Sequence, residues 1–193
     1  MPKDLLAIVG IALTFIAYIP YIYSIFQKKT KPHVFSWAIW GGTTFIVFLA
    51  QLSDEGGAGA WVIGVSACLV MCIAILAFIK KSDITIFKSD WYFLFIAIVA
   101  SMFWYFSSDP LWTVIILTIM NVVGFGPTLK KAYANPFEEN LNFFLIVAVR
   151  NTVSVMALEN YSLTTVFFPV VTAIACLAVV LIMAYRKSTF VRT

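Results

Sequence analysis

A single arginine lies deep inside an apolar run of this sequence and is its strongest chemical signal. Arg150 stands in LIVAVRNTVSVMAL, eight residues before the end of the apolar segment 141–158. A helical rise of about 1.5 Å per residue places it about 12 Å inside that segment. In a membrane such a charge costs about 3 kcal/mol or more and marks a solute pathway or an intramembrane pairing. We expect Arg150 to bind a carboxylate, a phosphate or a hydroxyl-rich solute. The alternative is an anchor that bonds helix-end carbonyls or reaches outward toward Glu159.

Amides and tryptophans at helical spacing extend this candidate site. Asn151 adjoins Arg150, and Val147 and Ser154 share their helical face at spacings of three and four. A second apolar run carries two tryptophans and a threonine on the matching face, and a third run holds a deep asparagine. Because rings stack on tryptophan and hydroxyls bond to amides, this set suits a flat or ring-shaped polar solute. An alternative for Trp37 is the aromatic belt at the membrane interface. The predicted substrate-binding residues are Trp37, Trp40, Thr44, Asn121, Arg150 and Asn151.

The same apolar runs lack the groups that an enzyme or a metal site needs. Intramembrane catalysis requires a nucleophile with a base, paired carboxylates or metal ligands. No histidine or acid lies deep in these runs, and His33, the one histidine, stands in a loop where it is expected to start a helix. The three cysteines, Cys68, Cys72 and Cys176, stand in apolar runs and are expected to be small core residues. We therefore expect no enzymatic activity, no metal and no cofactor.

The elements that must position these residues are membrane helices. Of the 193 residues, 62% are hydrophobic and 11% are charged, whereas soluble domains carry about 25% charged residues. A bilayer core of about 30 Å needs about 20 apolar helical residues. Seven segments meet or approach this length: Leu5–Phe26, Val34–Leu52, Ala60–Ile79, Trp91–Phe106, Leu111–Lys130, Leu141–Leu158 and Leu163–Tyr185. The expected fold is an all-α integral membrane protein with seven transmembrane helices.

Charge separates the two sets of helix ends. The end that includes the N-terminus carries Lys3 as its one basic residue, with Asp54 and Glu159 among its acids. The other end carries Lys28, Lys29, Lys31, Lys80, Lys81, Lys88, Lys130, Lys131, Arg186, Lys187 and Arg192. The positive-inside rule then places the N-terminus outside and the C-terminus in the cytoplasm. Short loops without a sorting signal favour the inner (plasma) membrane of a bacterium or archaeon. Because the net charge of +4 lies in these short loops, no nucleic-acid partner is expected.

The first and fifth segments carry the same features in the same order. Aligning Pro20 with Pro127 places Thr14 on Asn121, and each proline is followed by a basic loop, a second proline and an aromatic helix start. Helices one to three therefore repeat as helices five to seven, with the fourth as a linker. Because the extra span restores the chain direction, the two triple-helix bundles are expected to lie parallel. The expected division is 1–81 for the first repeat, 82–107 for the linker and 108–193 for the second repeat.

The repeated prolines suggest hinges within two helices. Proline removes a backbone hydrogen bond and clashes with the preceding turn, so it kinks a helix. We interpret Pro20 and Pro127 as paired hinges of an inner gate. The alternative is a static kink that improves packing, since prolines are tolerated in membrane helices.

This 3-1-3 order of helices, with an outside N-terminus and a proline near the inner end of each unit's first helix, resembles the SWEET and PQ-loop transporters. The resemblance covers nearly the whole chain and implies alternating access around a central site. The Pro-Gln pair of that family is absent, because Tyr21 follows Pro20 and Thr128 follows Pro127. The second helices lack the family's prolines and the third helices lack its pocket asparagine. Nicotinamide riboside transporters share the 3-1-3 plan.

The expected function is transport of a small polar solute, sugar-like or amino-acid-like, by alternating access. Proton-driven relatives use deep acids, which these spans lack, so a facilitator is favoured. One alternative is uptake of a vitamin or nucleoside of the nicotinamide riboside type, and another is a seven-helix receptor without transport activity. A retinal protein is excluded because the segment 163–185 contains no lysine. The expected partners are the solute and the lipid bilayer, and a monomer suffices because one chain holds both units.

Overall fold

The computed structural model describes residues 2–28, 32–80, 88–136 and 140–190, which are helical apart from short connections. The helices are α1 (Lys3–Phe26), α2 (Val34–Ser53), α3 (Ala58–Ile79), α4 (Lys88–Ser107), α5 (Leu111–Gly124), α6 (Gly126–Ala134), α7 (Leu141–Ala157) and α8 (Leu163–Phe190). The boundary expected between residues 81 and 82 lies outside the described residues. So do four of the basic residues counted above, Lys29, Lys31, Lys81 and Arg192.

The helices have the length and surface of a helical membrane protein. Four of the described helices, α1, α2, α3 and α8, are long and apolar enough to cross a bilayer, and α4, α5 and α7 hold shorter apolar stretches. Large apolar side chains cover the outside of the bundle, such as Phe78 at 69% exposed and Leu181 at 69%. Without water to bond the backbone, a chain in lipid must satisfy its N–H and C=O groups within helices. The apolar runs are therefore expected to form helices independently of how they pack against one another.

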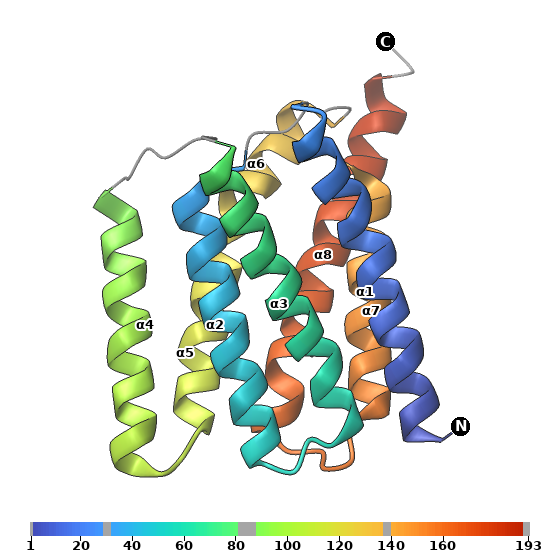
Figure 1. Ribbon diagram of the computed structural model, residues 1–193. Coiled ribbons are helices and arrows are strands. Elements are labelled where there is room, and N and C mark those ends of the chain that lie inside the picture. The colour runs from blue at the N-terminus through green and yellow to red at the C-terminus, as the bar shows by residue number, and fades with distance from the viewer. Residues whose placement is uncertain (1, 29–31, 81–87, 137–139, 191–193) are drawn as a thin grey trace.

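Consecutive long helices run in opposite directions (Figure 1). The N-terminus and the loops after α2, α4 and α7 lie at one end, which holds Asp54, Glu55, Asp109 and Glu159 and is here called the acidic end. The C-terminal end of α8 lies at the opposite, basic end. Helix α1 packs against α3 and α7, α2 against α3 and α5, and α8 against α5, α6 and α7. Helix α4 lies at the edge of the bundle and packs against α2 and α5.

The fifth predicted segment, Leu111–Lys130, is two helices rather than one. Helix α5 ends at Gly124 and α6 begins at Gly126, with Phe125 between them. Glycines on both sides weaken a helix at this point, and Pro127 has no N–H with which to continue the hydrogen-bond ladder. Pro127 lies in the first turn of α6, where proline is tolerated. Pro20, in contrast, lies inside the uninterrupted helix α1.

The start of α2 confirms the role expected for His33. Its ring nitrogen Nδ1 accepts a hydrogen bond from the backbone N–H of Ser36 at 3.2 Å, so His33 caps the helix. Asn140 caps α7 in the same way, accepting from the N–H of Phe143 at 3.3 Å.

The prediction for the cysteines is right for one residue and wrong for two. Cys176 is buried, whereas Cys68 and Cys72 are exposed on α3. The reason is that in lipid the outside of a bundle is as apolar as its core, so an apolar run does not reveal which side faces inward.

Candidate functional site

Arg150 lies in the middle of α7 with its side chain buried inside the bundle. Its side chain is 3% exposed. Tyr18 on α1 and Cys176 on α8 lie close enough to interact with it electrostatically. Its Nε and Nη1 atoms have no hydrogen-bond partner in the part of the chain that the structure describes. These two atoms therefore bond neither helix-end carbonyls nor Glu159, as the anchoring alternative would require.

Asn151 adjoins Arg150 and also has an unused polar atom. It is completely buried, and its Nδ2 donates a hydrogen bond to the carbonyl of Val147 at 2.9 Å. Its Oδ1 has no partner among the described residues. Neighbouring residues on α7 thus present unused donors and an unused acceptor inside the bundle.

The two tryptophans belong to an aromatic cluster on the basic-end side of Arg150. Trp37 and Trp40 meet edge to face with ring centroids 5.7 Å apart. Tyr21 on α1 lies 5.0 Å from the Trp37 ring and 6.4 Å from the ring of Phe143 on α7. Tyr18 meets Phe143 edge to face at 5.5 Å. We call Tyr18, Tyr21, Trp37, Trp40 and Phe143 the aromatic cluster; it joins α1 and α2 to α7.

Trp40 also reaches across to the end of α5. A Cβ built on Gly124 would lie 2.9 Å from Trp40 Nε1, so only glycine lets the indole pack this closely. Asn121, half-buried, stands three residues before Gly124 and shares its helical face. Thr44 is buried one turn after Trp40.

The predicted residues come from three helices, and the structure brings several of them to one part of the bundle. Both tryptophans pack against a buried core that includes Val147, Tyr18 and Cys176. Tyr18 and Cys176 also interact electrostatically with Arg150.

At the acidic end a hydrogen-bonded seal joins two loops that are far apart in sequence. Asn160 Nδ2 donates to the carbonyl of Asp54 at 2.9 Å, and the Ser162 hydroxyl donates to Asp54 Oδ2. The N–H of Glu159 donates to the carbonyl of Gly56 at 3.2 Å. We call residues 51–57 and 158–165 the acidic-end seal.

Gln51 completes the seal from within α2. It is fully buried, and its Nε2 donates to the carbonyl of Thr165 on α8 at 2.6 Å. Sequence reasoning missed the seal because its residues look like ordinary loop and helix-end residues. The available signal was that both loops follow the second helix of a predicted repeat.

Lys3 reinforces the same end from α1. Its Nζ donates to the carbonyls of Met156 at 3.0 Å and Leu158 at 2.6 Å, and to the hydroxyl of Tyr161 at 2.7 Å. These carbonyls lie at the C-terminal end of α7, on Met156 in its last turn and on the capping residue Leu158, where a cation complements the helix dipole. The one basic residue of the acidic end therefore ties α1 to α7.

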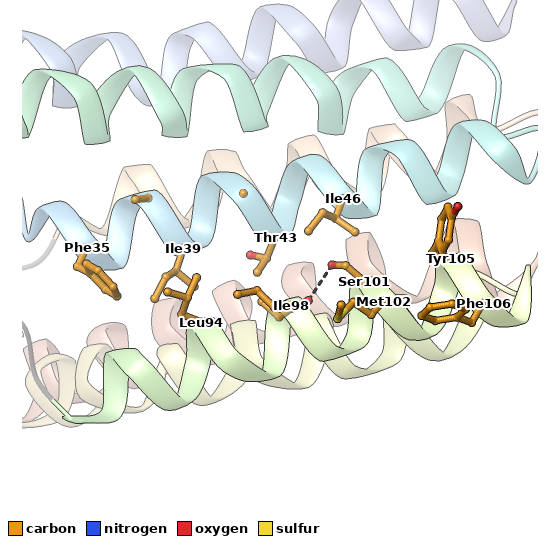
Figure 2. Close-up of a pocket in the computed structure, with 13 residues that line it drawn as sticks. Phe35, Ile39, Thr43, Ile46, Leu94, Ile98, Ser101, Met102, Tyr105 and Phe106 are labelled. Carbon is orange, nitrogen blue, oxygen red and sulfur yellow. Dashed lines mark hydrogen bonds between the residues drawn. The ribbon is translucent and has the colours of Figure 1, made fainter.

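A groove of about 630 Å³ lies elsewhere, between α2 and α4 (Figure 2). Apolar side chains such as Ile39, Ile46 and Met102 line it. The hydroxyl of Ser101 donates to its own helix at Ala97, and that of Thr43 to the carbonyl of Trp40. None of the predicted substrate-binding residues lines the groove. A groove with so apolar a lining is poorly suited to a polar solute.

The described residues contain no group of three or more His, Cys, Asp or Glu side chains that could hold a metal ion. No protein-family model, curated protein or solved structure matches this chain.

Proposed function

We propose that this chain is a membrane transporter that moves a small polar solute by alternating access. In this proposal α1–α3 form one unit, α5–α8 form the other, and α4 links them. The solute binds between the units near Arg150 and Asn151, and the units part first at one end of the bundle and then at the other.

The observation that carries the proposal is the pattern of helix packing. Let α5 with α6 stand for α1, α7 for α2, and α8 for α3. The contacts of α1 with α3 and of α2 with α3 then become those of α5 with α8 and of α7 with α8, which also occur. The contacts between the units follow the same substitution. The contact of α1 with α7 corresponds to that of α5 with α2, and the contact of α3 with α7 corresponds to that of α8 with α2; all four occur. This exchange of contacts supports two similar units around a shared interface, an arrangement that many transporters with a rocking motion have.

Two closures on either side of Arg150 support the same proposal. The acidic-end seal joins the loop after α2 to the loop after α7, one from each unit. The aromatic cluster joins α1 and α2 to α7 toward the basic end. Opening either closure would expose the buried polar groups to one side of the membrane. The Pro20 and Pro127 hinges of the proposal lie on the basic-end side, with the break at Phe125 between α5 and α6.

The proposed transporter is a facilitator. The acids within the eight helices are Asp4 and Asp90, each in the first turn of its helix. A proton relay normally uses acids at depth in the membrane, and the described helices have none there.

The test is uptake by the purified protein in liposomes. Labelled monosaccharides, disaccharides, neutral and basic amino acids, organic acids, nicotinamide riboside and thiamine are offered to the wild type and to Arg150→Ala, with and without a proton gradient. We expect saturable uptake of one solute class that does not depend on the gradient and is lost in the variant. Saturable uptake of nicotinamide riboside would select the vitamin alternative. Absence of uptake for every solute would contradict transport of these classes and favour the receptor alternative.

A further inference from the structure

Arg150 is the one charged residue of the eight helices that stands away from the helix ends. The other basic residues in the helices occupy first turns, the last five residues of α8 or the short helix α6, and the two acids occupy first turns. Arg150 stands ten residues into α7 and eight residues from its end, counting Arg150 itself. The middle of the bundle therefore holds a positive charge for which the helices supply no matching negative charge.

Neutral neighbours do not satisfy this charge either. Nε and Nη1 lack partners among the described residues, and the nearby Tyr18 and Cys176 are not carboxylates. The hydroxyls that follow on α7 are directed toward backbone carbonyls, Thr152 to that of Ala148 at 3.0 Å and Ser154 to that of Gly59 at 3.0 Å.

The nearest acid along the chain is also out of reach. Glu159 lies nine residues after Arg150, which is about 13 Å along a helix, and it is exposed at the acidic end. The Arg150 side chain instead lies near Tyr18, toward the aromatic cluster. A buried ion that keeps unpaired nitrogens is costly unless something else supplies the opposite charge.

We propose that the solute itself supplies that charge: the transported molecule is a small organic anion whose carboxylate or phosphate binds Arg150. This proposal rests on the proposed transport function and narrows its substrate class. A planar guanidinium matches either anion with charge-assisted hydrogen bonds. The free Oδ1 of Asn151 accepts a hydrogen bond from a hydroxyl or N–H of the same solute.

Matched pairs of charged and neutral ligands test the proposal by binding alone. Thermal unfolding of the purified full-length protein in detergent is followed at constant ionic strength. The pairs are nicotinate with nicotinamide, glucuronate with glucose, lactate with lactamide, and 3-phosphoglycerate with glycerol. We expect at least one anion to raise the Tm of the wild type with at least tenfold higher apparent affinity than its neutral partner. If only 3-phosphoglycerate raises the Tm, the site recognises a phosphate; if the other anions also raise it, the site recognises a carboxylate.

Variants assign the effect to this arginine. Arg150→Gln is expected to abolish the anion-induced shift, and Arg150→Lys to retain part of it because the charge remains. The matched control is Arg186→Gln, since Arg186 lies near the end of α8, where its Nε donates to the carbonyl of Tyr133. The control is expected to keep the full shift.

A measurement without ligand separates this role from a structural one. Replacing an unpaired buried charge with a neutral side chain removes a cost, so Arg150→Gln is expected to unfold at the same or a higher temperature than the wild type in the absence of anions. An anchoring arginine would give the opposite result, a clear fall in Tm, which would overturn the proposal.

The remaining outcomes separate this inference from the transport proposal. Anion binding that depends on Arg150, without uptake in liposomes, would support the anion site and contradict transport. Uptake of a neutral solute that Arg150→Gln leaves unchanged would support transport and overturn the anion proposal. No difference between wild type and Arg150→Gln for any anion of the panel would also overturn it.

Discussion

Arg150 and Lys3 show how far single residues can be interpreted from sequence. The depth of Arg150 follows from the apolar run around it, because a long apolar run in lipid is a helix with known rise. Its neighbours Tyr18 and Cys176 could not be predicted, because they depend on how α1 and α8 pack against α7. From the sequence, Lys3 was interpreted only as a charge that helps to orient the chain. In the structure it forms hydrogen bonds that link α1 to the end of α7.

Removing the Lys3 bridge should loosen the acidic end. Lys3→Gln loses the hydrogen bonds to Met156, Leu158 and Tyr161, and we expect a loss of about 1 kcal/mol in stability because the site is partly exposed. Thermal unfolding measures it. Lys28→Gln is the control, since Lys28 is an exposed lysine beyond the opposite end of α1. Equal Tm values for the two variants would contradict the bridging role.

At the scale of helices, sequence reasoning gave the spans closely but missed a break. The segment 34–52 is observed as Val34–Ser53, and 91–106 as Lys88–Ser107. Hydropathy locates such spans because lipid forces apolar runs into helices. The break at Phe125 was not predicted, because the glycines on either side do not interrupt the apolar run that marks the span.

Close helix contacts at glycine give a sharp prediction. A Cβ on Gly59 of α3 would lie 2.6 Å from the backbone N of Leu158 and 2.7 Å from the carbonyl oxygen of Ser154 on α7. Because backbone atoms cannot move aside cheaply, Gly59→Ala should cost about 1–3 kcal/mol and weaken the acidic-end seal. Gly42→Ala meets nothing within 4 Å and should be neutral. Thermal unfolding of both variants tests this, and similar Tm values would refute the close approach.

The two prolines should differ in their effect. Pro20→Ala restores a hydrogen bond inside the continuous helix α1, so we expect an unchanged or higher Tm and at least threefold slower uptake if α1 bends there. Pro127→Ala should have a smaller effect on uptake, because Gly124 and Gly126 remain beside the break. Uptake rates and Tm values of the two variants measure this. Unchanged uptake in both would favour static kinks over hinges.

At the scale of the molecule, locking the acidic-end seal closed should stop transport without unfolding the protein. Asp54 and Ser162 are hydrogen-bonded across the acidic-end seal, so cysteines at both positions should form a disulfide. With exposed Cys68 and Cys72 replaced by alanine, oxidation should slow uptake at least tenfold and reductant should restore it. Single-cysteine variants control for damage by the oxidant. Full uptake through the cross-linked protein would contradict a gate at this end.

In the proposed transport cycle, the charge in the middle of the bundle should affect the rate at which the protein reorients. A carrier that closes around an unpaired guanidinium pays a desolvation cost that a bound anion removes. The loaded protein should therefore reorient faster than the ligand-free protein. Exchange of internal for external solute should therefore outpace net uptake in the wild type, whereas Arg150→Gln, which no longer binds the anion, should show neither.

Counterflow in liposomes tests the central claim of alternating access most directly. Liposomes preloaded with unlabelled solute are placed in a trace of the labelled solute, and internal label is followed over time. A carrier predicts that label rises transiently above its external concentration, because outward flow of unlabelled solute returns binding sites to the outside. Label that only approaches its external concentration, with the same time course in preloaded and unloaded liposomes, would contradict a carrier.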